Sequence, residues 1–348
     1  MTHIHIDGSQ GEGGGQVLRS SLALSLVTGI PFTIDNIRAK RVKPGLRQQH
    51  LTAVRAAAEV GGCNVDNTKV GAVRLDFRPA QVKGGDYTFN VGTAGSVTLV
   101  LQTVLPALML AEEPSTLTLR GGTHNPMAPP FDFLQRVYLP LVKRLGPTIE
   151  ATLVKPGFYP AGGGEFRAAI TPVRKLSNLE LTRRGDILQQ KGKIILARLP
   201  NHIAEREKDT LLQKTGWAKE TVQIETIASA NGPGNVVMLE VVSENVTELF
   251  TGFGEIKVSA EAVAQKALDQ YQEYLAAEVP VGKYLADQLM LPLSIAAWQG
   301  SGSSLFRTLH LTQHSRTHID ILQRFLKIDI EAENVNYRQT DVILGGRS

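Results

Sequence analysis

The sequence of 348 residues contains a single cysteine, Cys63. One cysteine excludes an intrachain disulfide and any zinc site built from cysteines. Long apolar runs are also missing, since the stretch from Val97 to Leu110 is interrupted by Thr, Gln and Pro and is too short to span a bilayer. The N-terminus has neither the basic start nor the apolar core of a signal peptide. These absences predict a cytoplasmic protein with no membrane partner.

A strong charge of either sign is missing as well. The chain has 37 Lys and Arg against 33 Asp and Glu, a formal net charge of +4. This small excess permits a polyanionic partner without requiring one. Hydrophobic residues make up 42% of the chain, which suits a globular protein with room for two domains.

Three of the eight histidines fall four residues apart, at His310, His314 and His318. If the segment is helical, this spacing stacks the three side chains along one face. Imidazoles at neutral pH ligate metals, transfer protons or act as nucleophiles. A zinc site is the runner-up interpretation, but a hydrolytic zinc site also needs a nearby carboxylate and an open water position, and no His-Glu-x-x-His pattern is present. Solvated histidines on a polar helix face are the plainer alternative.

A glycine-rich loop spans residues 8–15 and precedes a helical pattern at residues 16–28. Its backbone N–H groups are suited to an anion at a helix N-terminus, although the loop is neither a P-loop nor a dinucleotide-binding fingerprint. A carboxylate inside such a loop, Glu12, is suited to a metal ion carried by a nucleotide. A simple tight turn is the alternative.

Basic residues gather behind this loop. Six cations and no carboxylate lie between Arg38 and Arg55. Such a cluster predicts a phosphate-binding surface, with a solvated basic face as the alternative.

The order of predicted elements recurs along the chain: a strand, a helix, a strand, a second helix, and then further strands. The predicted first helices are residues 16–28, 96–111 and 283–297, and the second helices are residues 47–60, 131–145 and 312–326. Strands also follow the second helices, at residues 63–66, 149–152 and 328–331. Between the second and third units, residues 186–277 mix strands with two helices, which suggests a small inserted α/β domain.

Four separate motifs, in this order, resemble the RNA 3′-terminal phosphate cyclase family. They are IDGSQGEGGGQ at 6–16, KPGLR at 43–47, GFYPAGGG at 157–164 and YLADQ at 284–288. The third is the signature of that family. The resemblance runs from residue 4 to the third unit, nearly the whole chain.

This resemblance implies a reaction in which a histidine attacks the α-phosphate of ATP, releases pyrophosphate and becomes covalently adenylated. AMP then passes to an RNA 3′-terminal phosphate, giving RNA(3′)pp(5′)A, and the neighbouring 2′-hydroxyl expels AMP to leave a 2′,3′-cyclic phosphate. The family places its nucleophile three residues before a Thr that is usually followed by Asn-Ile. The match is HSRTHI at 314–319, which implies His314 as the nucleophile, with His318 in place of the Asn.

Residue by residue, the same resemblance implies the remaining contacts. ATP would be bound by Gln102, Pro130, Tyr284, Leu285, Ala286, Asp287 and Gln288, with Tyr284 stacked on adenine and Pro130 over its other face. The terminal RNA phosphate would be bound by Arg19, Arg38, Arg41 and Gln49. Glu12, and more weakly Asp287, would hold a divalent metal, Mg²⁺ or Mn²⁺. His310 is left either to orient the substrate phosphate or without a chemical role.

The implied fold is α/β (α+β). A large domain, residues 1–185 and 278–348, would contain three repeated units, each a four-stranded sheet with two helices, and residues 186–277 would form an inserted thioredoxin-like domain. Two rivals remain: a catalytically silent relative that serves as an RNA-binding scaffold in ribosome biogenesis, and an enolpyruvyl transferase built from similar repeats. The sequence does not predict the oligomeric state.

Overall fold

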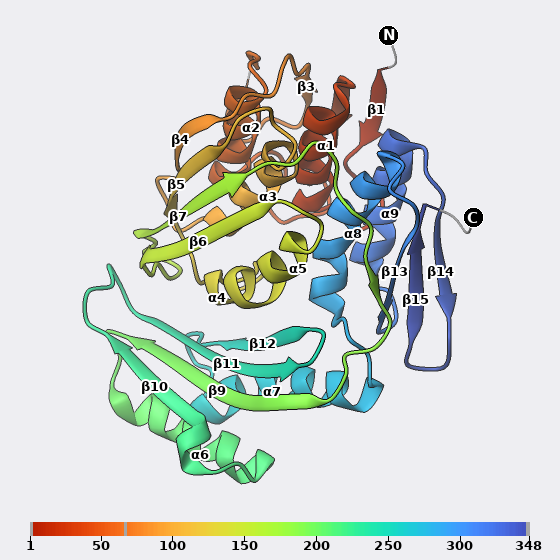
Figure 1. The fold of residues 1–348 in the computed structure, drawn as a ribbon. Coiled ribbons are helices and arrows are strands. Elements are labelled where there is room, and N and C mark those ends of the chain that lie inside the picture. Colours follow the sequence, from red (N-terminus) through yellow and green to blue (C-terminus); the bar gives the residue numbers. More distant parts are fainter. Residues whose placement is uncertain (1–2, 66–67, 346–348) are drawn as a thin grey trace.

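The computed structural model describes residues 3–65 and 68–345. It is a mixed α/β protein, as predicted, with its strands gathered in four sheets (Figure 1). Three of the sheets surround a bundle of helices, and the fourth forms a separate lobe below them.

The first sheet has the order β1-β2-β3, with β1 and β2 parallel and β3 antiparallel to β2. A fourth strand was expected after Gly62, but residues 63–65 form none, and position 66 lies outside the described residues. The elements are β1 (Ile4–Asp7), α1 (Gly15–Thr28), β2 (Phe32–Asp35), α2 (Gln48–Val60) and β3 (Leu75–Phe77).

The second sheet has the order β4-β5-β7-β6, in which only the β4–β5 pair is parallel. The helix predicted at residues 131–145 is divided, because a π-helical stretch, η1, separates α4 from α5. The elements are β4 (Gly85–Asn90), α3 (Val97–Leu108), β5 (Ser115–Gly121), α4 (Phe131–Phe133), η1 (Leu134–Tyr138), α5 (Leu139–Lys143), β6 (Thr148–Lys155) and β7 (Gly164–Thr171).

The third sheet repeats this arrangement with the order β8-β13-β15-β14, and again only the first pair is parallel. Its first strand precedes the lower lobe in the chain, and the other strands follow it. The elements are β8 (Glu180–Leu181), α8 (Lys283–Trp298), β13 (Ser304–Thr308), α9 (Gln313–Leu326), β14 (Ile330–Asn334) and β15 (Thr340–Leu344).

The lower lobe is built on the fourth sheet, of order β10-β9-β11-β12. One face of this sheet packs against α6 and α7 around its own apolar cluster, while Val236, Met238 and Leu249 join the main core through the other face. The elements are β9 (Ile187–Ala197), α6 (Asn201–Thr215), the 3₁₀ turn η2 (Lys219–Thr221), β10 (Val222–Ile227), β11 (Gly234–Ser243), β12 (Thr247–Phe253) and α7 (Ala260–Ala277).

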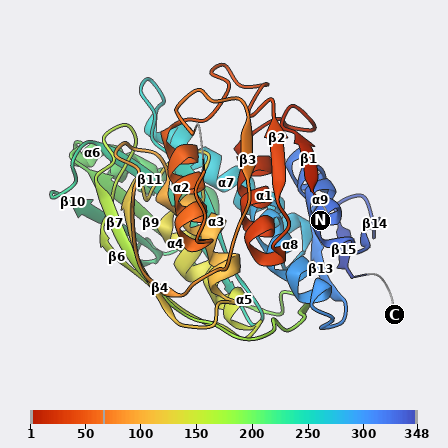
Figure 2. The ribbon, with the colours of Figure 1, turned by 90° about the horizontal axis from the view of Figure 1, so that it is seen from above.

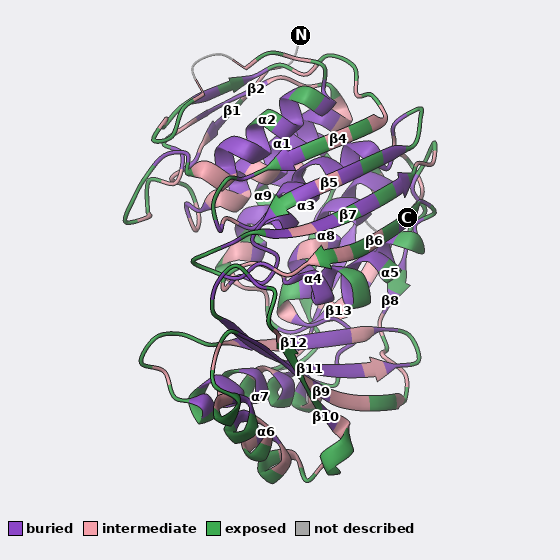
Figure 3. Ribbon diagram, turned by 90° about the vertical axis from the view of Figure 1, so that its left-hand side faces the viewer, coloured by how far each residue is buried: buried purple, intermediate pink, exposed green. Residues whose placement is uncertain are grey.

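Seen from above, α1, α3 and α8 occupy the middle of the upper lobe (Figure 2). The sheet that contains β6 and β7 lies on one side of them, and β13 to β15 lie on the other. These central helices are apolar over most of their surface and are largely buried (Figure 3), because sheets and other helices cover them on several sides. Across the described residues, no helix combines the length and the apolar character that spanning a membrane requires.

Candidate active site

His314 lies in the first turn of α9. Thr312 caps this helix, its hydroxyl oxygen accepting a hydrogen bond from the Ser315 N–H at 3.1 Å. The helix begins close to the predicted start at residue 312 and does not include His310, so the three histidines do not stack along one helix face. His310 instead lies 2.7 Å, Nε2 to O, from the Tyr337 carbonyl, so it supports the turn between β14 and β15.

Asp287, on the neighbouring helix α8, fixes the His314 ring. His314 Nδ1 lies 2.8 Å from Asp287 Oδ2, and the Ser315 hydroxyl donates to Asp287 Oδ1 at 2.5 Å. A carboxylate can only accept, so in the neutral ring Nδ1 carries the proton and Nε2 keeps its lone pair. Because Asp287 is buried, this arrangement orients a nucleophilic nitrogen toward the open side of the site.

Glu12 lies on that open side. Its Oε2 is 3.5 Å from His314 Nε2, and the Arg41 guanidinium donates to its Oε1. The glycine loop reaches α9 because Gly11 has a φ of +57°, and a Cβ at Gly11 would overlap the Thr317 hydroxyl. The Glu12 N–H donates to that hydroxyl at 3.2 Å. Two motifs about 300 residues apart in sequence, the glycine loop and the histidine helix, are thus joined by direct contacts.

The basic residues lie beside this loop, but they are not equivalent. Burial lowers the pKa of Arg19 to about 10, a value that still leaves it charged at neutral pH. Burial, with Arg19 nearby, lowers the pKa of His50 to about 3 and keeps that ring neutral. Arg38 donates to the carbonyls of Lys43 and Gly45 at 2.9 and 2.8 Å, so part of its guanidinium supports its own loop.

Gln49 links this region to the second unit. Its Oε1 accepts a hydrogen bond from the Ser96 N–H, the N-cap residue of α3, at 3.1 Å. The N-terminus of α3 therefore lies next to the N-terminus of α2. Of the four residues expected to bind phosphate, Arg41 contacts Glu12 directly, and the charge of Glu12 also acts on the buried Arg19.

The residues expected to bind ATP form a second group. Gln102 on α3 and Gln288 on α8 share a hydrogen bond, and Tyr284 precedes Gln288 by one turn with 56% of its surface exposed. Thr98, one turn before Gln102, donates to the Pro129 carbonyl at 2.8 Å and so holds Pro130 at the start of α4. Tyr284 on α8, and Thr98 on α3 with its bond to Pro129, each lie about one helical turn before a member of the glutamine pair.

Leu285 and Ala286 differ from the other residues of the YLADQ motif. Both are fully buried in the hydrophobic core and have at most 1% exposure. Successive residues of a helix point about 100° apart, so Leu285 and Ala286 face the core while Tyr284 and Gln288, one turn apart, share another face of α8. Their side chains support α8 and are not open to a nucleotide.

Within the described residues, no group of three or more His, Cys, Asp or Glu side chains is arranged to hold a metal ion. Glu12 supplies one carboxylate, and both oxygens of Asp287 already accept hydrogen bonds from protein groups. One carboxylate is a typical share for a metal bound mainly through nucleotide phosphates. The donor set fits a divalent ion that arrives with ATP, and it does not fit a zinc site made by the three histidines.

The sequence did not point to every residue of the site. Ser315 appeared only as a spacer, and Thr317 only as the Thr of the family motif, although each bonds a partner from another segment. His318 is buried, and burial lowers its pKa to about 4, so it is neutral beside Asp287 and His314. The helical spacing of four between His314 and His318 indicated a shared face, but only packing against α8 and α1 decided which ring is covered.

Comparison with known proteins agrees with the four motifs. Residues 10–332 match the family described as RNA 3′-terminal phosphate cyclase. The chain is 52% identical over 331 residues to a protein of Koribacter versatilis (strain Ellin345) named RNA 3′-terminal phosphate cyclase, an alignment that covers 95% of this chain and 92% of the relative. This chain therefore belongs to the RNA 3′-terminal phosphate cyclases, a family of enzymes.

Proposed function

We propose that the protein converts an RNA 3′-terminal phosphate into a 2′,3′-cyclic phosphate in an ATP-dependent reaction that passes through adenylated His314. The observation that carries this proposal is the hydrogen bond between His314 Nδ1 and Asp287 at 2.8 Å, which in the neutral ring leaves Nε2 as the free nitrogen, facing Glu12. Family membership supports the overall activity, and the geometry supports the choice of nucleophile.

In the first step, His314 Nε2 attacks the α-phosphorus of ATP, and the bond to the pyrophosphate leaving group breaks. The ring gains positive charge as the P–N bond forms, and the adjacent Asp287 carboxylate stabilises that charge. Splitting the condensation through a covalent phosphoramidate replaces one difficult displacement by easier ones.

In the second step, an oxygen of the RNA 3′-phosphate attacks the phosphorus of His314-AMP and releases the histidine. The ribose 2′-hydroxyl then attacks the RNA phosphorus and expels AMP, which leaves the cyclic phosphate. Arg19 and Arg41 would bind the terminal phosphate, together with Gln49 and one edge of the Arg38 guanidinium, because a guanidinium pairs well with phosphate oxygens.

We assign the adenine to the slot between Tyr284 and Pro130, above the Gln102–Gln288 pair. Tyr284 offers an exposed ring for stacking, and the glutamine amides offer hydrogen bonds to the base edge. Glu12 would hold Mg²⁺ or Mn²⁺ bound to the triphosphate, and the metal would supply charge neutralisation at the transferring phosphorus. Asp287 serves in this proposal as the partner of His314, and its role as a metal ligand stays an untested prediction.

The architecture follows the same proposal. We interpret the three upper sheets as repeats, because the second and third share one strand order and one pattern of pairing, and β1-β2-β3 matches three of the four positions. We also propose that residues 186–277 are an inserted thioredoxin-like domain, since β9 begins at Ile187 and α7 ends at Ala277. The cytoplasmic location remains a prediction from the sequence.

The test is incubation of the purified protein with [α-³²P]ATP and a divalent metal, followed by denaturing gel analysis. An acid-labile, alkali-stable label that RNA with a 3′-phosphate discharges is the expected result. His314→Ala should abolish the label, and His310→Ala, the matched control, should retain it. Full labelling of His314→Ala would contradict the assignment, while a folded wild-type protein without label would favour the scaffold alternative.

A further inference from the structure

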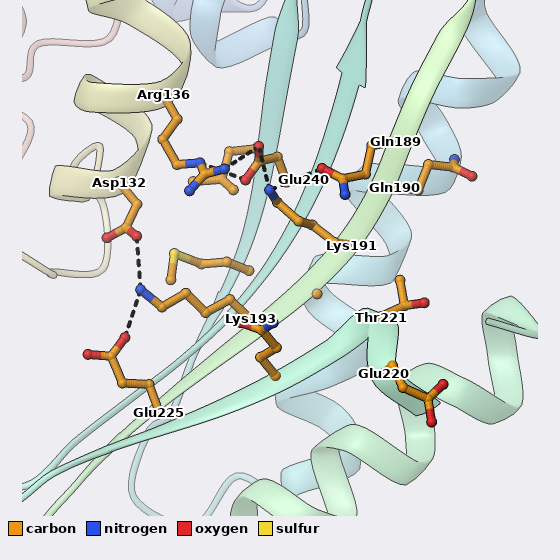
Figure 4. A pocket seen from close by; sticks show the side chains of 14 residues that line it. Asp132, Arg136, Gln189, Gln190, Lys191, Lys193, Glu220, Thr221, Glu225 and Glu240 are labelled. Atoms are coloured by element: carbon orange, nitrogen blue, oxygen red, sulfur yellow. Dashed lines mark hydrogen bonds and ion pairs between the residues drawn. The ribbon is translucent and has the colours of Figure 1, made fainter. Parts of the chain in front are cut away.

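The lower lobe faces α4 and η1 of the upper lobe across a cleft of about 710 Å³. The cleft is lined by charged side chains of both signs, which reach from α4 and η1 above and from the open face of the fourth sheet below (Figure 4). Its cations are paired: Arg136 Nε lies 2.7 Å from Glu240 Oε2, and Lys191 Nζ lies 3.6 Å from Glu240 Oε1. These ion pairs neutralise the positive charge of the cleft, so the cleft is a poor binding surface for a polyanion. The pair between Arg136 and Glu240 instead connects the upper lobe to the lower lobe.

Lys193 forms the contact that matters most. Its Nζ lies between Glu225 Oε2 at 2.8 Å and Asp132 Oδ1 at 3.5 Å (Figure 4). Glu225 belongs to the same sheet as Lys193, whereas Asp132 lies in the first turn of α4, two residues after Pro130. The lower lobe thereby reaches one wall of the proposed adenine slot.

A buried chain of hydrogen bonds continues from Asp132 into the upper lobe. Asp132 Oδ2 lies 2.8 Å from His124 Nε2, and His124 Nδ1 lies 2.8 Å from the Thr123 hydroxyl. The Asp132 carboxylate can only accept, so Nε2 of a neutral His124 ring carries the proton and Nδ1 accepts from the Thr123 hydroxyl. The Gly157 N–H donates to the oxygen of that hydroxyl at 2.9 Å. The chain therefore runs from Asp132 through His124 and Thr123 to the Gly157 backbone.

This chain fixes two backbone segments. The Thr123 carbonyl accepts from the Phe131 N–H at 2.9 Å, which sets the position of α4 directly after Pro130. The Gly157 contact holds the first residue of the signature loop. Just before this loop, Lys155 Nζ donates to Asn231 Oδ1 of the lower lobe at 2.6 Å. The motif that identifies the family thus lies where the two lobes meet.

The opposite wall of the slot is also tied to the lower lobe. Glu248 on β12 is buried, and its Oε1 accepts from the Gly282 N–H, at the N-cap of α8, at 2.5 Å. Tyr284 lies two residues into that helix. A Cβ at Gly282 would meet Glu248 Oε1 at 2.9 Å, so glycine permits the close approach.

We propose that the inserted domain is a positioning element that sets the two walls of the adenine slot: Lys193 acts through Asp132, His124 and Thr123 on Pro130, and Glu248 acts through Gly282 on Tyr284. The inference rests on the proposed function, because it takes Pro130 and Tyr284 as the faces of the base. It assigns Lys193 and Glu248 a role in ATP affinity without contact with the nucleotide.

The test compares Lys193→Met with Arg206→Met. Arg206 forms a two-bond pair with Glu261 inside the lower lobe, at 2.8 and 2.7 Å, and does not reach the upper lobe, so it is the matched control. The rate of self-adenylation is measured over a range of ATP concentrations. Lys193→Met should raise the half-saturating ATP concentration by about 2- to 30-fold with little change in the maximal rate. Lys193→Arg, which keeps the positive charge, should have the half-saturating ATP concentration of the wild type. Arg206→Met should also leave that concentration unchanged.

A second measurement separates this proposal from the proposed function. The affinity for ATP is measured by calorimetry in the His314→Ala background, where no chemistry can occur, with and without Lys193→Met. Weaker ATP binding in the double variant supports the positioning role even if the wild type proves not to adenylate itself. Unchanged ATP affinity in a protein that melts normally would overturn the positioning role, even if wild-type labelling proceeds as proposed.

Discussion

Replacing Asp287 by Asn removes one charge while keeping the shape of the side chain. In the wild type, Asp287 Oδ2 accepts from His314 Nδ1–H at 2.8 Å, and Oδ1 accepts from Ser315 at 2.5 Å. If Ser315 continues to donate to the Asn oxygen, the Asn amide nitrogen faces His314 Nδ1 and donates to it. The imidazole proton then moves to Nε2, the nitrogen that must attack phosphorus.

The size of the effect follows from this change of tautomer. The same substitution beside the histidine of a Ser-His-Asp triad lowers kcat by about 10⁴-fold through the wrong tautomer. The variant also loses the negative charge next to a ring that becomes cationic. We therefore expect Asp287→Asn to slow self-adenylation by about 10³- to 10⁴-fold, with a much smaller change in ATP affinity.

Single-turnover labelling with [α-³²P]ATP measures this rate directly. Ser315→Ala is the matched variant, because it removes one hydrogen bond to the same carboxylate and leaves the His314 contact in place. We expect Ser315→Ala to cost about tenfold or less in rate, in line with about 1.5 kcal/mol for one hydrogen bond to a charged group. A rate for Asp287→Asn within tenfold of the wild type would refute the tautomer argument.

Three further variants test other parts of the structure. Gly11→Ala should lower the rate of self-adenylation at least about tenfold, because a Cβ at this position overlaps Thr317. Gly29→Ala is the control, since Gly29 also has a positive φ but lies in open space, and it should cost only about 1 kcal/mol of stability. Equal rates of self-adenylation in the two variants would contradict the role of the Gly11 contact. Burial raises the pKa of Glu248 to about 8 in the folded protein, so stability should fall as pH rises from the unfolded value of 4.5 through that pKa. Glu248→Gln, which keeps the acceptor for Gly282, should therefore gain up to about 1.4 kcal/mol per pH unit relative to wild type in urea denaturation; a difference that does not depend on pH would count against this. Burial lowers the pKa of His318 to about 4, so the folded state loses stability as pH falls from 6.5 toward that value. His318→Asn should therefore reduce the loss of stability over this acid range in urea denaturation. An unchanged loss of stability would show that His318 is not the group responsible.

Most helices could be predicted from the sequence because their signals are local. Apolar spacing indicated α1, α2, α8 and α9 to within one or two residues. Two predicted elements differ in the structure: the strand expected at residues 63–66 and the single helix expected at residues 131–145. Residues 63–65 have strand-like composition but no partner strand, and the segment from residue 131 is divided by a π-helical stretch that repetition alone does not encode.

The site shows the same division. The sequence by itself determined which reactive and charged groups are available: His314 in a family motif, Glu12 in a glycine loop, and the basic cluster from Arg38 to Arg55, which contains no carboxylate. Only the tertiary structure decided which groups act together, since Glu12, Asp287 and His314 come from three distant helix N-terminal regions that meet through packing. It also placed His310 against the Tyr337 carbonyl, covered Leu285 and Ala286, and brought Lys193 to Asp132. Spacing along a chain fixes which face of a helix a residue occupies, but the neighbour of that face is set by the free energy of the whole core.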